Sequence, residues 1–287
     1  MSNLDIAERR IPQDGRMSLK LGEKWVDIRV STLPSSFGER LVLRLLDKAD
    51  ASLDLEELGM TSEMTKDYLQ QLKSTSGIIL VTGPTGSGKT TTLYSGLNFL
   101  NDQTRNILTV EDPIEYALEG VGQTQVNNKV GLSFSKGLRA ILRQDPDVVM
   151  VGEIRDKETA ETAIQASLTG HLVLSTIHTN DSVGAIIRLI DMGVEPYLLA
   201  STLKMVIAQR LVRKLINKNE FSGRVGIFEM IKIDSEIKNY INETVDEDKI
   251  RKIAFKKYNS LLNDGEEKVK KGITSELEIK RVLKQVD

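Results

Sequence analysis

The sequence predicts an α/β protein with a parallel sheet at its centre, antiparallel strands before it and helices after it. Three changes in the hydrophobic pattern support this fold class. Apolar residues alternate near the N-terminus, short apolar runs alternate with helical segments after Gly77, and charged helical spacing dominates beyond Asp234. With 287 residues, the chain suits one large domain with smaller neighbours. We expect a partial N-terminal α+β domain at residues 1–50, an α/β domain with lead-in helices at 51–233 and a helical C-terminal subdomain at 234–287.

The first elements are expected to be antiparallel strands. Apolar side chains recur at every second position between Arg16 and Leu46, with a turn at residues 22–24, and this period is typical of strands with one buried face. The spacing then becomes helical, with acidic residues in the first turns. We therefore place a linker at Asp47–Ser52 and helical structure after it.

The middle of the chain alternates between short apolar runs and helical segments. The runs GIILVTG, NILTVED, DVVMVGE and HLVLSTIH predict buried strands, and segments such as KETAETAIQASLTG and DSVGAIIRLIDMG predict helices. This alternation is typical of a parallel sheet flanked by helices.

Composition excludes several kinds of site. The chain has no cysteine, so disulfides, thiolate zinc sites and catalytic thiols are excluded. The formal net charge of -2 gives no global basic field for nucleic acid, although it does not exclude a local basic channel. No run approaches the roughly 18 apolar residues that a spanning helix needs, and the polar start does not resemble a signal peptide. We therefore expect a soluble, cytoplasmic protein.

A phosphate-binding loop is predicted between the first strand of the sheet and the helix that follows it. The pattern G-x-x-x-x-G-K-T runs from Gly83 to Thr90, in the strand-to-helix context that the motif requires. Glycines let backbone N–H groups surround phosphates, Lys89 reaches the β and γ phosphates, and the Thr90 hydroxyl is placed to bind Mg²⁺. The residues expected to contact the nucleotide are Gly83, Pro84, Thr85, Gly86, Ser87, Gly88, Lys89, Thr90 and Thr91.

Carboxylates follow two of the other predicted strands. Glu153 ends the run DVVMVGE, and Glu111 and Asp112 end NILTVED. In open parallel sheets ligands bind outside the carboxyl ends of the strands, so these side chains are expected to face the nucleotide or its metal. The alternative is that they are solvated loop acids.

The two histidines of the chain, His171 and His178, flank the apolar run LVLSTI. Two histidines without a third suitable ligand make a poor zinc site, because zinc normally takes three or four protein ligands. Side chains seven residues apart on a strand also point to opposite faces. We therefore expect no metal site shared by these two residues.

Four stretches, in this order, resemble the nucleotide-site boxes of the type II secretion and type IV pilus ATPase superfamily: GPTGSGKTTTLY, ILTVEDPIEY, LRQDPDVVMVGEIRD and GHLVLSTIHTND. The likeness extends upstream through residues 10–46 and downstream to AQRLVRKL, GRVGIFEM and LLNDGEEKVKKGIT, so it covers nearly the whole chain. The stretches RIPQDGR and RVSTLPSSFGER are similar to the assembly branch, from which the retraction ATPases differ.

The resemblance implies a RecA-like P-loop ATPase domain in a homohexameric motor that hydrolyses ATP with Mg²⁺. Such a motor works at the cytoplasmic face of the inner membrane, where it drives a platform protein that builds a type II secretion pseudopilus or a type IV pilus. A competence pilus for DNA uptake is the alternative that the sequence does not separate. Direct nucleic-acid binding is not expected from the family.

Two hypotheses from other classes compete with this one. A nucleic-acid translocase with a RecA-like core would need a basic channel with aromatic side chains, whereas the chain is 5% aromatic and has no basic block. A structural ring that binds nucleotide without hydrolysing it would not need the charged residues that follow the strands.

The resemblance also implies roles for single residues. Arg29 and Arg44 match arginines that reach the nucleotide phosphates from the smaller domain, which packs on a neighbouring subunit. Glu153 matches the Walker B glutamate and Glu111 the acidic-box glutamate. Glu153 is the first choice for the base and Glu111 the second, and both are candidates, with Thr90, to hold Mg²⁺ partly through water.

Further positions follow from the same resemblance. His178 matches a hydrogen-bonding sensor near the γ-phosphate, while His171 is left open between that network and ordinary packing. Positions that line subunit interfaces or relay the nucleotide state in the family are matched by Arg139, Arg143, Arg155 and Arg188.

The chain departs from the family in two places. Many assembly-branch members carry a four-cysteine zinc loop between the stretches that match RLVRKL and GRVGIFE, and here that interval is only INKNEFS, so no zinc site is expected. Family members also have a longer N-terminal region, so the resemblance implies that this chain begins partway through the domain that precedes the motor.

Overall fold

The computed structural model describes residues 2, 4–22, 24–46, 54–217, 220–243 and 246–283. The chain divides into two compact units, one of residues 1–52 with 115–117 and one of residues 53–114 with 118–287. The linker expected at Asp47–Ser52 lies outside the described residues. The division into three domains at residues 50 and 233 stays a prediction.

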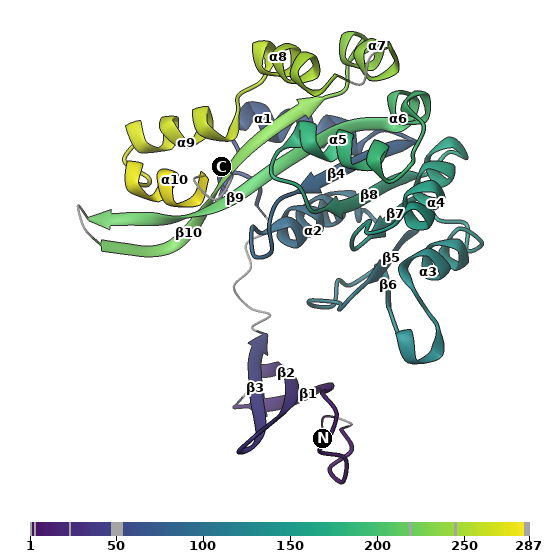
Figure 1. Ribbon diagram of the computed structural model, residues 1–287, viewed down its shortest axis with the longest axis vertical. Coiled ribbons are helices and arrows are strands. Elements are labelled where there is room, and N and C mark those ends of the chain that lie inside the picture. The colour runs from purple at the N-terminus through teal and green to yellow at the C-terminus, as the bar shows by residue number, and fades with distance from the viewer. Residues whose placement is uncertain are drawn as a thin grey trace. The chain divides into compact units, whose positions relative to one another are not determined.

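The smaller unit contains a three-stranded antiparallel sheet in the order β1-β2-β3 (Figure 1). The alternation between Arg16 and Leu46 therefore predicted its strands correctly. Ile28 and Val30 on the central strand are buried, because they lie in the middle of the apolar face, whereas Leu43 on the edge strand stays half exposed. The strands are β1 (Gln13–Leu21), β2 (Lys24–Ser35) and β3 (Gly38–Leu46).

The larger unit is built on a seven-stranded sheet in the order β10-β9-β4-β8-β7-β5-β6 (Figure 1). The four apolar runs form β4, β5, β7 and β8 and are parallel, as predicted, while the β9–β10 hairpin at one edge was not predicted. β9 is parallel to β4, and β10 returns antiparallel to β9. The strands are β4 (Gly77–Thr82), β5 (Ile107–Glu111), β6 (Gly122–Gln125), β7 (Val148–Val151), β8 (Leu172–Ile177), β9 (Leu203–Asn217) and β10 (Glu220–Lys232).

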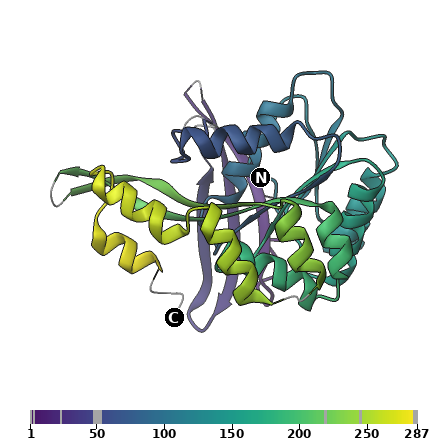
Figure 2. The same ribbon diagram turned by 90° about the horizontal axis from the view of Figure 1, so that it is seen from above.

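Helices cover both faces of this sheet (Figure 2). One large core joins alternate strand residues, such as Leu80 and Val151, to side chains of the helices from α3 to α8. The helices α1 and α2 pack together on the other face. Between the strands the helices are α1 (Ser62–Leu72), α2 (Lys89–Leu100), the 3₁₀ turn η1 (Asn128–Val130), α3 (Phe134–Ile141), α4 (Lys157–Leu168), α5 (Ser182–Asp191) and α6 (Pro196–Thr202).

The segment beyond Asp234 is helical, as predicted, but its helices serve two different cores. The pair α7 (Ser235–Glu243) and α8 (Glu247–Lys257) places apolar side chains in the large core beside α5. The pair α9 (Leu261–Lys270) and α10 (Glu276–Leu283) packs on the β9–β10 hairpin around a second apolar cluster. Among the described residues, no helix combines the length and apolar character needed to cross a membrane.

Candidate functional site

The carboxyl ends of β4, β8, β7 and β5 lie side by side at one edge of the large sheet, because these strands are neighbours and parallel. Each strand is followed at this edge by one of the sequence motifs. β4 leads into the loop at residues 83–88, β8 into His178, β7 into Glu153, and β5 ends at Glu111. The topology therefore gathers the four motifs at one place.

The loop between β4 and α2 has the backbone geometry of a phosphate cradle. Gly86 and Gly88 have φ angles of 78° and 87°, in the left-handed region that favours glycine. Gly88 is the N-cap of α2 and provides no side-chain hydrogen bond, whereas α4 and α5 are capped by Asp156 and Asp181. The first N–H groups of α2 therefore lack the side-chain acceptor that closes the neighbouring helices.

Lys89 lies within this loop and is almost fully buried. Its Nζ donates hydrogen bonds to the carbonyl oxygens of Gly83 at 2.9 Å and Pro84 at 3.1 Å. Burial lowers the pKa of Lys89 to about 8, although the negative charge of Glu153 opposes the shift. The loop thus holds a cation at a high energetic cost, a cost that an anion bound nearby would reduce.

The same loop carries a buried hydroxyl that the protein leaves unsatisfied. Ser87 Oγ is inaccessible to solvent and finds no hydrogen-bond partner among the residues that the structure describes. Buried polar groups are normally paired, so an unpaired one calls for an explanation. Together with the glycine backbone, the open N-terminus of α2 and the Lys89 ammonium, it forms a donor set that fits the phosphates of a nucleotide.

Two residues of β9 hold the phosphate loop from behind. Gln209 Nε2 donates to the Ser87 carbonyl at 2.6 Å, and its Oε1 accepts from Thr92 Oγ1 at 2.7 Å. Arg210 Nη1 donates to the Gln209 carbonyl at 3.1 Å. Sequence reasoning missed this support, although two polar residues inside the apolar run MVIAQRLV are an unusual feature of a buried strand.

Glu153 is surrounded by charged partners. Its carboxylate forms an ion pair with Arg155, and the Nε2 atom of His178 lies 3.2 Å from Glu153 Oε2. The Glu153 side chain is 11% exposed, and that of His178 is 48% exposed, so Glu153 is largely buried and His178 is half exposed. The structure therefore brings Glu153 and His178 into contact, with Lys89 close enough for Glu153 to influence its charge.

Glu111 has a different environment, made of neutral donors. It is only 2% exposed, and it accepts hydrogen bonds from the Tyr94 hydroxyl, from Thr109 Oγ1 at 2.6 Å and from Gln123 Nε2 at 3.0 Å. Sequence reasoning did not identify these three donors, because they lie on α2, β5 and β6. Asp112, the next residue, is exposed.

The other candidates are dispersed. His171 precedes β8, and its Nδ1 lies 2.9 Å from the Ala166 carbonyl and 3.1 Å from Thr169 Oγ1, so it belongs to the turn before the strand. The β8 strand thus separates the two histidines, which lie at its opposite ends. Ordinary local packing accounts for His171.

The remaining arginines fall into three places. Arg139 pairs with Glu158 at 2.5 Å, and Arg143 donates to the Arg139 carbonyl at 2.8 Å. Arg155 pairs with Glu153 at the site, and Arg188 lines a pocket beside α5.

Arg29 and Arg44 belong to the smaller unit, where they face each other on β2 and β3. Arg16 on β1 is the cross-strand partner of Arg29, so the register places three arginines in one row across the sheet. Like charges directly opposite each other are unfavourable in a sheet. The facing pair of Arg29 and Arg44 therefore does not stabilise the sheet through its charges.

The donor set for a metal is small. No group of three or more His, Cys, Asp or Glu side chains capable of holding a metal ion occurs in the part of the chain that the structure describes. The half-buried Thr90 and the carboxylate of Glu153 are the candidates at this edge. Such a set fits Mg²⁺, which usually keeps several waters and takes substrate phosphates as ligands.

Comparison with known protein families gives a match over almost the whole chain. The model of a family described as "Type II/IV secretion system protein" matches residues 1–284. "Type II secretion system protein E" of Pseudomonas aeruginosa is 52% identical over 99% of this chain, and "Type II secretion system ATPase E" of Vibrio cholerae is 51% identical over 99%. The chain spans 64% of the length of each of these relatives. The aligned stretch is 321 residues, longer than the 287 residues here, so the relatives carry segments within it that this chain lacks.

Solved structures give the same picture for the fold. The pilus retraction motor PilT with bound ADP is 31% identical, with a TM-score of 0.80 over 95% of this chain and 77% of that one. The ATPase DotB of Legionella pneumophila is 26% identical, with a TM-score of 0.78 over 94% of this chain and 77% of that one.

Proposed function

This chain belongs to the family of type II/IV secretion system proteins, and from that premise we propose that it is an ATP-hydrolysing motor of a type II secretion system. The observation that supports this proposal best is the phosphate cradle. Lys89, the unsatisfied Ser87 hydroxyl and the uncapped start of α2 lie at the same sheet edge as Glu153 and His178. The likeness to the ATPase structures PilT and DotB supports the same activity.

Each residue of the edge has a distinct proposed role. Lys89 and the backbone of residues 83–88 bind the β and γ phosphates, and Thr90 holds Mg²⁺ with help from Glu153. Mg²⁺, when bound, neutralises charge that develops on the phosphates. Glu153 orients and deprotonates the attacking water, and His178, in contact with Glu153, senses the γ-phosphate.

Glu153 is favoured over Glu111 as the base because of the partners of each. A general base must be able to accept a proton from water that reaches it. Both residues are buried, with Glu153 8% and Glu111 2% exposed, but Glu153 faces the half-exposed His178, whereas Glu111 accepts three hydrogen bonds within the protein. We assign Glu111 to holding the end of β5 and, through it, the position of the metal and the water.

The proposed assembly is a homohexamer in which Arg29 and Arg44 of one subunit complete the nucleotide site of the next. Arginines supplied in this way stabilise charge on the transferring phosphoryl group only when the ring closes. Arg29 and Arg44, which face each other on β2 and β3, support an anion as their shared partner. Positions for contacts between subunits or for relaying the nucleotide state are Arg139, Arg143, Arg155 and Arg188.

The motor would act at the cytoplasmic face of the inner membrane, where a platform protein of the secretion apparatus converts its motion into growth of a pseudopilus. Identity of 52% to a type II secretion protein, compared with 31% to the retraction motor PilT, favours assembly over retraction.

The test is steady-state ATP hydrolysis over a series of protein concentrations, with the particle mass measured across the same series. We expect specific activity to rise as a hexamer forms and to vanish in a Lys89→Ala control. Activity that is independent of concentration in a monomeric protein would contradict the shared site. Absence of hydrolysis in a hexamer with Mg²⁺ would contradict the enzymatic proposal itself.

A further inference from the structure

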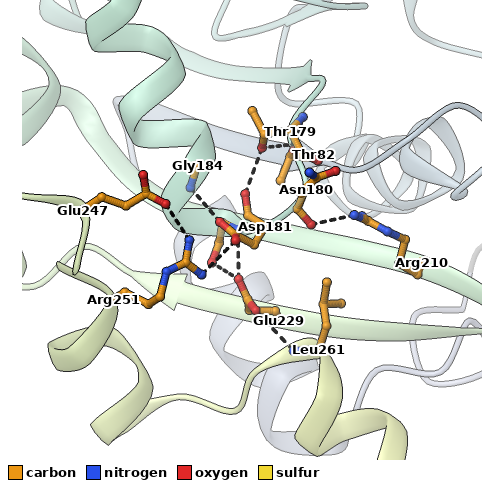
Figure 3. Close-up of polar contacts among 11 residues, drawn as sticks. Thr82, Thr179, Asn180, Asp181, Gly184, Arg210, Glu229, Glu247, Arg251 and Leu261 are labelled. Atoms are coloured by element: carbon orange, nitrogen blue, oxygen red, sulfur yellow. Dashed lines mark hydrogen bonds and ion pairs between the residues drawn. The ribbon is translucent and has the colours of Figure 1, made fainter. Parts of the chain in front are cut away.

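The loop that follows β8 is tied to the phosphate loop at its first residue after His178 (Figure 3). Thr179 Oγ1 lies 2.7 Å from Thr82 Oγ1, and the Thr179 N–H donates to Thr82 Oγ1 at 2.9 Å. Thr82 is the last residue of β4 and immediately precedes Gly83. A displacement of the histidine loop therefore acts directly on the start of the phosphate loop, and the reverse is equally true.

The next residues of this loop are tied to the β9–β10 hairpin. The Asn180 carbonyl accepts a hydrogen bond from Arg210 Nη2 at 2.6 Å (Figure 3). The Ser182 N–H donates to Glu229 Oε1 on β10 at 2.8 Å, and Glu229 Oε2 accepts from the N–H of Leu261 at 3.2 Å. These contacts are mostly buried, and they join the loop to β9, to β10 and to the start of α9.

Asp181 connects the same loop to the C-terminal helices. One oxygen, Oδ1, accepts from the Gly184 N–H at 2.7 Å and so caps α5, while Oδ2 pairs with Arg251 Nη1 of α8 at 2.8 Å (Figure 3). Arg251 Nη2 also bonds Glu247 at 2.7 Å, one turn earlier on α8. The side chains of Arg251 and Asp181 are 34% and 20% exposed, and they line an open pocket of about 550 Å³ between α5 and α8.

We propose that Arg251 is a positioning residue that couples the α7–α8 helix pair to the nucleotide through the loop of residues 178–182. The inference rests on the proposed function, since it requires a nucleotide at the phosphate loop. A shift of His178 toward or away from a γ-phosphate moves Asp181, three residues later. This movement strengthens or breaks the ion pair between Asp181 and Arg251. A partly exposed ion pair contributes little to stability, so it can break and reform easily.

The proposed coupling acts both from the nucleotide to α8 and from α8 to the nucleotide. Coupling between two sites is reciprocal, so whatever moves α8 must also change the affinity for nucleotide. The α7–α8 pair is therefore the element whose displacement would change nucleotide binding. The apolar side chains of α7 and α8 pack in the large core beside α5, so a displacement of these helices would also displace α5.

Matched variants separate this role from a structural one. Arg251→Gln removes the pair, and Arg251→Lys retains a charge. Asp181→Asn retains the helix cap, because asparagine caps as well as aspartate. Lys257→Gln is the control, because Lys257 ends the same helix and pairs with Asp234 at 2.8 Å and Glu236 at 2.6 Å.

The experiment measures hydrogen exchange of residues 178–184 and 247–257 with ADP and with a non-hydrolysable ATP analogue, together with kcat and KM. In the unaltered protein both segments should change exchange with the nucleotide. In Arg251→Gln the change at 247–257 should disappear and the affinity for nucleotide should fall about 5-fold, in the range of measured couplings between sites. Arg251→Lys should recover part of the nucleotide-dependent change in exchange at 247–257, and Lys257→Gln should match the unaltered protein.

The double variant Asp181→Asn with Arg251→Gln should be no worse than either single one, because both remove the same pair. Additive effects would overturn the proposal. It would also be overturned if α8 showed no nucleotide-dependent exchange in the unaltered protein, or if Arg251→Gln behaved as Lys257→Gln does. Loss of hydrolysis in the unaltered protein contradicts the proposed function instead, because exchange with bound nucleotide still reports the coupling.

Discussion

Glu111 and Glu153 end neighbouring strands of the same sheet, yet their surroundings differ in kind. Glu111 at the end of β5 accepts from a tyrosine, a threonine and a glutamine, all neutral, and is almost inaccessible. Glu153 after β7 pairs with Arg155, lies beside the half-exposed imidazole of His178 and raises the pKa of Lys89 through its charge.

This difference in surroundings indicates different roles for the two carboxylates. A carboxylate held by several neutral donors is fixed in place and has little capacity left for another proton donor. A carboxylate among charged and titratable groups can change its partners when a substrate arrives. We therefore propose that Glu111 holds the end of β5 in place and that Glu153 acts as the general base.

The largest effect is expected from Glu153→Gln. Loss of a general base lowers kcat by about 10²- to 10⁴-fold, while the amide keeps the size of the side chain. The measurement is steady-state ATP hydrolysis, with binding followed by a fluorescent ATP analogue. Hydrolysis at the unaltered rate would remove Glu153 from the mechanism.

Glu111→Gln should act mainly on stability. The amide nitrogen replaces one acceptor oxygen and faces the donors of the Tyr94 or Gln123 side chain, so a buried polar group loses its partner. Such a loss costs about 1–3 kcal/mol. Urea unfolding of this variant and of Glu153→Gln should show the larger loss for Glu111→Gln. A larger loss of stability in Glu153→Gln would contradict the structural role of Glu111.

The two histidines provide a test with a smaller expected effect, in which the His171 variant is the control for the His178 variant. His178→Gln removes an imidazole that lies 3.2 Å from the Glu153 carboxylate and should lower kcat about 10-fold, which corresponds to about 1.4 kcal/mol of transition-state stabilisation. His171→Gln changes only the turn before β8 and should leave kcat unchanged. Equal effects of the two variants would contradict the separation of the histidines by the strand.

The smallest effect concerns the charge of Lys89. With a pKa of about 8, its ammonium loses a proton as pH rises through 8, so ATP affinity should fall above that pH and binding should take up a proton there. Calorimetry at about pH 8.5, in two buffers of different ionisation enthalpy, measures this uptake. Lys89→Arg should show none of it.

The two carboxylates should also differ in this titration. Glu153 raises the pKa of Lys89, so Glu153→Gln should move the uptake to lower pH. Glu111→Gln should leave its midpoint in place. A shift caused by Glu111→Gln instead would place Glu111, rather than Glu153, beside the cation.

Much of this arrangement follows from local sequence pattern. The strand-loop-helix context identified the phosphate loop, and the four apolar runs predicted β4, β5, β7 and β8. The rule that ligands bind outside the carboxyl ends of parallel strands predicted that Glu153 and Glu111 lie at one edge, and β7 and β5 are indeed parallel neighbours. These features depend on short segments or on topology, which periodicity reveals.

Other features could not be read from periodicity. Gln209 and Arg210 support the phosphate loop from a strand that follows it by about 120 residues, as the hydrogen bond from Gln209 to Ser87 shows. Asp181 and Arg251 meet across 70 positions, and the donors around Glu111 come from three elements. Side-chain pairing over such separations depends on tertiary packing, and a single sequence carries no local signal for it.

The most direct test of the division of roles is the rate of ATP cleavage in a single turnover, with enzyme in excess and the reaction stopped by acid. This rate isolates the chemical step from product release. We expect Glu153→Gln to slow cleavage at least 100-fold, whereas Glu111→Gln, compared at equal fractions of bound ATP, should slow it less than 10-fold. A larger loss of cleavage in Glu111→Gln than in Glu153→Gln would reverse the assignment and make Glu111 the base.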